Sequence, residues 1–144
     1  MCLGVSETHR RGTEELVLNG YKFVAQGTEE GAHRSGVGLL LNKTAQKAFQ
    51  GYNPVSDRII CVKFQTMVGY LVVIQVYAPT ADAAAEDIEA FYCLLQTAVS
   101  EQRDATFLVV MGNYNAKVPV GTDWDNAGGA LGKFGTGDLN KAGE

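Results

Sequence analysis

The sequence is poor in the residues that build disulfide frameworks and zinc sites. It holds three cysteines, Cys2, Cys61 and Cys93, and two histidines among 144 residues. The cysteines are odd in number, far apart and never in a C-x-x-C pair, so we expect buried, reduced thiols and a reducing compartment. The same scarcity and spacing argue against a zinc site.

Charge of one sign and long apolar runs are also lacking. The formal net charge is −4, which argues against nucleic-acid binding by bulk positive charge but does not exclude a metal-dependent phosphodiesterase. The N-terminus has no apolar core long enough for a signal peptide. The most apolar stretch, Leu71–Ala78, is interrupted by Gln75 and is too short to span a bilayer. We therefore expect no membrane partner and an intracellular location, nuclear or cytoplasmic.

The chain does carry one strong helix signal. From about Ala83 to Glu101, apolar residues recur at i, i+3, i+4 and i+7, which predicts an amphipathic helix that Asp82 could cap. The apolar runs on either side of this helix predict a β–α–β crossover. Glu14–Val17 is read as a helical turn and Asn53-Pro54 as a turn. The predicted strands are Leu3–Val5, Tyr21–Ala25, Gly36–Leu41, Arg58–Phe64, Tyr70–Tyr77 and Phe107–Met111.

The stretch Thr106–Lys117 is the centre of the functional interpretation. Phe107–Met111 is an unbroken apolar run, typical of a central strand covered on both faces. Gly112-Asn113-Tyr114-Asn115 follows directly, and a glycine at a strand end lets the backbone turn or approach a ligand closely. A site at the carboxyl end of a strand is one interpretation, and a simple turn is the alternative.

Polar groups also follow other apolar strands. Glu7 follows the first strand and Tyr77 closes a later one, so these ends and the asparagine pair would converge if their strands shared a sheet. Mg²⁺ prefers carboxylate oxygen and keeps several waters, while hydroxyl and amide groups can donate to phosphate oxygens. Arg10 and Arg34 could line a phosphate-binding rim, although a solvated surface is the simpler reading of each.

The motifs in this order resemble those of the endonuclease/exonuclease/phosphatase superfamily. They are Ser6-Glu7-Thr8, Val76-Tyr77-Ala78-Pro79-Thr80 and Gly112-Asn113-Tyr114-Asn115-Ala116-Lys117, with support from Asp57-Arg58-Ile59-Ile60 and from Gly135–Glu144. The closest resemblance is to the apurinic-endonuclease-like domains of LINE-type (non-LTR) retrotransposons. The craniofacial-development-protein-2-like proteins belong to the same group.

This resemblance implies an α/β fold, roughly the N-terminal half of a four-layer DNase I-like sandwich. Residues 1–144 would form one partial domain, with 118–144 mostly loop. Glu7 would bind Mg²⁺ (or Mn²⁺), Tyr77 would contact the scissile phosphate, and Asn115 and Asn140 would position phosphate and nucleophile. The implied reaction is metal-assisted hydrolysis of a phosphodiester in DNA or RNA.

The sequence departs from the family pattern at the position of the catalytic base. The family reads Gly-Asp-x-Asn, and Asn113 stands in place of that aspartate. An amide cannot accept a proton near neutral pH, so roughly 10²–10⁴-fold of general-base catalysis would be lost. Three hypotheses stay open: an impaired Mg²⁺-dependent endonuclease, a catalytically dead retrotransposon-derived binding module, and a small-molecule or lipid phosphate hydrolase. An incomplete sandwich would also expose an apolar face and favour self-association.

Overall fold

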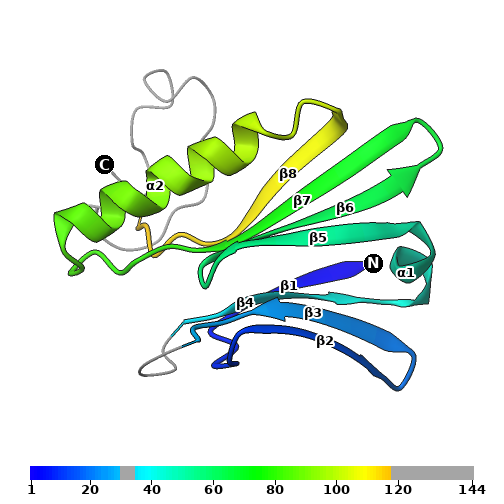
Figure 1. Ribbon diagram of the computed structural model, residues 1–144, viewed down its shortest axis with the longest axis horizontal. Coiled ribbons are helices and arrows are strands. Elements are labelled where there is room, and N and C mark those ends of the chain that lie inside the picture. Colours follow the sequence, from blue (N-terminus) through cyan, green and yellow to red (C-terminus); the bar gives the residue numbers. More distant parts are fainter. Residues whose placement is uncertain (30–34, 118–144) are drawn as a thin grey trace.

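Within residues 1–29 and 35–117, which the computed structural model describes, the chain folds into two four-stranded β-sheets (Figure 1). Sheet A is antiparallel and has the strand order β1-β4-β3-β2; sheet B has the order β5-β6-β7-β8, and only its β7–β8 pair is parallel. The elements are β1 (Cys2–Ser6), β2 (Thr13–Leu18), β3 (Tyr21–Gln26), β4 (Val37–Leu41), α1 (Lys43–Ala48), β5 (Phe49–Ser56), β6 (Ile59–Thr66), β7 (Gly69–Tyr77), α2 (Ala85–Ser100) and β8 (Ala105–Asn113).

The two sheets bury one apolar core between them. Val37, Leu39 and Leu41 alternate along β4 and are fully buried, because every second side chain of a strand points to the same face. They belong to the same cluster as Val62 of β6 and Val73 of β7. The inner faces of both sheets are therefore joined into one sandwich.

Helix α2 covers the other face of sheet B. Val72, Ile74 and Val76 of β7 pack with Phe91 and Ala98 of α2 in a second buried cluster. Strand β7 is thus buried on both faces, which explains its nearly unbroken apolar sequence. Sheet A, sheet B and α2 form successive layers (Figure 1). This arrangement confirms the predicted fold class, part of a DNase I-like α/β sandwich.

The predicted crossover is confirmed. Helix α2 spans Ala85–Ser100 and joins the parallel strands β7 and β8. Glu86 and Asp87 lie in its first turn, where negative charge favours the helix dipole. The proposed Asp82 cap is wrong: the N-cap is Ala84, which makes no side-chain capping bond.

The predicted helical turn at Glu14–Val17 is also wrong. These residues lie in β2, which pairs with β3. Asn19 and Gly20 connect the two strands with φ angles of 51° and 80°, and an Asn-Gly pair with positive φ is the favoured two-residue hairpin turn. The hairpin signal therefore overrides the weak helix signal.

The Asn53-Pro54 turn and the missed helix α1 are further corrections. Asn53 and Pro54 lie inside β5, at the outer edge of sheet B, where proline is tolerated because the free edge needs no N–H donor. Helix α1 is too short for a periodic signal. Its N-cap Asn42 accepts a hydrogen bond from the Ala45 N–H at 3.0 Å.

Strand β8 is not the buried central strand that its sequence predicts. In the described residues it pairs only with β7, and the side chains from Phe107 to Val110 are 36–52% exposed. Within the described residues, the apolar run of β8 is therefore exposed on both faces of the sheet, and one edge of the strand is unpaired.

The prediction of buried thiols holds for Cys61 but not for Cys93. Cys61 is buried in β6, and burial, followed by the charge of Glu101, raises the pKa of its thiol to about 11. Cys93 is exposed on α2, so the prediction that it is buried is wrong, and Cys2 is half-buried. None of the helices in residues 1–29 and 35–117 has the length and apolar character needed to cross a bilayer. The predicted loop at 118–144 lies outside the described residues.

Candidate active site

The end of β1 meets the ends of β7 and β8, although β1 belongs to the other sheet. β1 belongs to sheet A, and β7 and β8 belong to sheet B. The Ser6 hydroxyl at the end of β1 donates to the Val76 carbonyl of β7 at 3.4 Å, and the Gln75 amide donates to the Ser6 hydroxyl at 3.2 Å. The predicted convergence therefore occurs across the sandwich rather than along the rim of a single sheet.

Tyr77 is the centre of this convergence. Its side chain is 8% exposed, and its hydroxyl is hydrogen-bonded to the side chains of Glu7 and Asn115. Burial first, and then the Glu7 charge, raise the pKa of the phenol above its usual value, while Arg58 and Asn115 oppose the shift. A phenol is protonated at neutral pH even at its ordinary pKa, and the upward shift does not change this, so the hydroxyl is a hydrogen-bond donor.

Asn113, the last residue of β8, and Asn115, just beyond it, each form side-chain hydrogen bonds with the backbone. The Asn115 N–H donates to the Asn113 side-chain oxygen at 2.9 Å, and the Asn115 side-chain amide donates to the Ala78 carbonyl at 2.7 Å. The Ala78 N–H in turn donates to the Asn113 carbonyl at 2.8 Å. This local turn places Asn115 beside Tyr77 and uses the Asn113 oxygen as a turn acceptor.

Backbone strain is concentrated at the site. In the described ranges, the non-glycine residues with positive φ are Glu7 (56°), His9 (52°) and Asn115 (51°), together with Asn19 in the hairpin. Such conformations cost about 1–3 kcal/mol for ordinary residues and persist where the surroundings impose them. Here the Thr8 N–H donates to the carbonyl of Gly36 at 3.2 Å, which fixes the loop after β1.

Gln75 supports the end of β1 and was not predicted as a functional residue. It is 3% exposed in the core, where an unpaired amide would be costly. Its amide donates to Ser6, and a Cβ on Gly4 would meet its side-chain oxygen, so a larger residue at that position would displace the Gln75 side chain. The only sequence signal was a polar residue that interrupts an apolar run.

Arg58 was also missed as a site residue. It precedes β6, its Nη1 donates to the Tyr77 carbonyl at 3.2 Å, and its guanidinium carbon lies 5.1 Å from the centre of the Tyr77 ring. A charge so close to the phenol contributes to the electrostatics of the site. Its sequence signal was an arginine directly before a buried strand.

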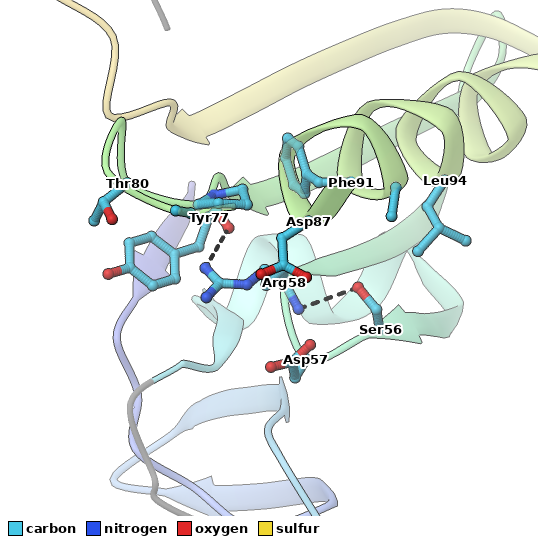
Figure 2. A pocket seen from close by; sticks show the side chains of 11 residues that line it. Ser56, Asp57, Arg58, Tyr77, Thr80, Asp87, Phe91 and Leu94 are labelled. Atoms are coloured by element: carbon cyan, nitrogen blue, oxygen red, sulfur yellow. Dashed lines mark hydrogen bonds between the residues drawn. The ribbon is translucent and has the colours of Figure 1, made fainter. Parts of the chain in front are cut away.

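A cleft of about 560 Å³ opens beside Tyr77, between the start of β6 and helix α2 (Figure 2). Its lining includes Asp57, Arg58, Tyr77, Asp87 and Phe91. The volume is in the range of small-molecule sites. The cleft and the Glu7–Tyr77–Asn115 cluster share Tyr77, so a ligand in one would lie next to the other.

Arg10 lines a different groove from Tyr77, and two other predicted site residues lie outside the described residues. Arg10 forms an ion pair with Glu14 at 3.4 Å and lines a groove with Leu16 and Phe23 of sheet A. Arg34 and Asn140 lie outside the described residues.

The residues at Tyr77 fit a hydrated divalent cation better than a fully protein-ligated one. No group of three or more His, Cys, Asp or Glu side chains in residues 1–29 and 35–117 could hold a metal ion. Mg²⁺ is often held by one or two carboxylates plus waters and substrate phosphate. The exposed Glu7 carboxylate could supply one such ligand.

Comparison with known proteins gives a relative along almost the whole chain. The sequence is homologous to craniofacial development protein 2. It is 37% identical to the Bos taurus protein and 36% identical to that of Tragulus javanicus, each over 141 residues and 98% of this chain. No protein-family model matches.

The comparison confirms the predicted resemblance to craniofacial-development-protein-2-like proteins. The matched region is 23% of the Bos taurus relative and 24% of the Tragulus javanicus relative, so the chain spans about a quarter of their length. The relationship therefore concerns one region of these relatives.

Proposed function

We propose that this chain is a Mg²⁺-dependent, endonuclease-like phosphodiester hydrolase domain whose catalysis is impaired by Asn113. The observation that supports it is the Tyr77 hydroxyl hydrogen-bonded to Glu7 and Asn115, on strained loops from both sheets. The substrate is a nucleic-acid strand, DNA or RNA, and Mn²⁺ is an alternative cation.

Each side chain has a distinct task in this proposal. Glu7 would hold the cation, which neutralises phosphate charge and orients the attacking water when bound. The Tyr77 phenol is protonated at neutral pH, and its single O–H, which is hydrogen-bonded to Glu7 in the structure, would turn to a phosphate oxygen as charge develops. Asn115 and Asn140 position the phosphate and nucleophile. Arg10 and Arg34 contact the substrate backbone.

A second function is a catalytically inactive binding module for nucleic acid or protein. Asn113 favours it, because its side-chain oxygen already accepts the Asn115 N–H and an amide is no general base. This module would keep the sandwich and its surface without turning over a substrate.

Thermal unfolding tests the cation site directly. At a Mg²⁺ concentration ten times the dissociation constant, a native-state ligand adds about 1.4 kcal/mol to the free energy of unfolding. We expect millimolar Mg²⁺ to raise the midpoint by a few degrees and Glu7→Gln to abolish the rise. Glu89→Gln, an exposed carboxylate on α2, is the matched control. An equal rise in the Glu7→Gln protein would refute the assignment of Glu7.

Asn113→Asp tests whether one substitution explains the impairment. Aspartate keeps an oxygen that can accept the Asn115 N–H, so the turn should survive. We expect nicking of abasic DNA with Mg²⁺ to stay at background, because no group of three or more His, Cys, Asp or Glu side chains in the described residues could hold a metal ion firmly. A gain of 10²-fold or more, the lower end of a general-base contribution, would show instead that Asn113 is the sole defect.

A further inference from the structure

The cleft beside Tyr77, here called the α2 cleft, is lined by apolar and polar side chains together. Pro79, Phe91 and Leu94 are its larger apolar residues; the first two are buried, and Leu94 is exposed at the rim. Asp87 comes from the same helix as Phe91 and Leu94, whereas Arg58 and Thr80 come from outside the helix. A concave site with apolar surface and a few convergent polar groups is typical of small-molecule binding, and the exposed Leu94 side chain offers an apolar surface to a flat base.

The α2 cleft carries two carboxylates, Asp57 and Asp87, and one guanidinium, Arg58. Asp57 accepts hydrogen bonds from the hydroxyls of Ser35 and Thr28, which precede β4. Arg58 uses one N–H for the Tyr77 carbonyl, and a guanidinium group has further donors that suit phosphate. The cleft therefore offers a cation next to Tyr77.

Asp87 is the acceptor that faces the cleft from α2. In Figure 2 its carboxylate points from the helix toward the Arg58 side of the cleft. An ionised carboxylate only accepts hydrogen bonds, so it selects ligands with paired N–H donors. Among the nucleobases, guanine presents its ring N–H and its amino group side by side.

We infer that the α2 cleft binds a guanine nucleotide, with its phosphate beside Arg58, its base against the exposed side chain of Leu94, and its N–H edge toward Asp87. The inference rests on the proposed function in one respect: because Tyr77 is shared, the bound nucleotide would be the one next to the scissile phosphate. The cleft thereby gives the hydrolase a preference for guanine at that position.

Nucleotide binding to the full chain tests this assignment in the absence of metal. Equilibrium dialysis or NMR titration with GMP, IMP and CMP in EDTA is the measurement. We expect saturable GMP binding and about tenfold weaker IMP binding, because IMP lacks the amino group that donates to Asp87. Equal affinities for GMP, IMP and CMP, or no saturable GMP binding, would overturn the proposal.

Two variants and a control locate the site. Asp87→Asn should weaken GMP binding about tenfold and remove the preference over IMP. Ala90→Phe fills the cleft from the same helix and should abolish binding of all three nucleotides. Asp82→Asn changes an exposed carboxylate just before α2 that does not line the cleft, and should leave GMP affinity unchanged. Unchanged GMP affinity in both cleft variants would refute the location.

The result is separable from that of the proposed hydrolase. If GMP binds through Asp87 but Mg²⁺ does not change the unfolding midpoint, the nucleotide site is supported and the Mg²⁺-dependent hydrolase is refuted. Mg²⁺ stabilisation that depends on Glu7, without GMP binding, would do the reverse.

Discussion

Gly112→Ala is expected to lower the free energy of unfolding by about 3 kcal/mol or more. A Cβ at this position would clash with the backbone carbonyl of Val76, which cannot rotate away, and the φ of 148° is one that L-residues rarely adopt. The loss would also reach the site, because Asn113 follows directly and its carbonyl accepts the Ala78 N–H. Urea denaturation followed by circular dichroism measures the change.

Gly51→Ala is the matched control for this prediction. Gly51 has a similar φ of 152°, but no atom lies within 4 Å of the position that its Cβ would take. Its substitution should therefore carry only the backbone strain, about 1–3 kcal/mol. Equal losses in the two variants would show that strain alone, and not the collision with Val76, makes Gly112 necessary.

The elements with strong local patterns were predictable from the sequence. The apolar stripe of α2 predicts a helix and the apolar run of β7 predicts a buried strand. Both patterns are local, because side chains face the core at spacings that are characteristic of each kind of element. Their order then implies the parallel β7–β8 pair. Glu7, Tyr77 and Asn115 were identified as strand-end residues, and the structure does bring these three side chains together.

Sheet membership was not predictable in the same way. A strand's sequence shows how much of it is buried, but not which neighbour pairs with it. The end of β1 reaches Val76 from sheet A, and β8 lies at the edge of the described sheet B although its sequence resembles that of the buried β7. Partners far apart in sequence decide both placements.

Arg58 and Gln75 show why the contacts that hold the site together could not be predicted from the sequence. Each acts through a contact with a residue whose position depends on the fold: Arg58 with the carbonyl and ring of Tyr77, and Gln75 with Ser6 across the sandwich. A single arginine before a strand or a glutamine within one has many structural explanations. Only the three-dimensional contacts assign these two residues to the site.

Strand β8 is the basis for the proposed self-association. It contains no charged residue from Ala105 to Asn113, and its side chains are exposed toward both faces: Val109 is in register with Val73 of the inter-sheet core, and Leu108 with Val72 of the helix-side core. The other sheet has an edge strand, β2, that carries Glu14 and Glu15. Charges on an edge discourage pairing with another chain, and β8 lacks them.

We therefore expect two copies of the chain to associate through β8, related by a two-fold axis so that their edges pair antiparallel. Val109→Lys should weaken this association at least tenfold, because the pairing would bring like charges close together and bury them. Val17→Lys on β2, where Val17 is 66% exposed, should leave it unchanged. Sedimentation velocity over a range of chain concentrations distinguishes the species. A wild-type chain that stays monomeric at high micromolar concentration, or equal effects of the two lysines, would show that β8 is not the contact.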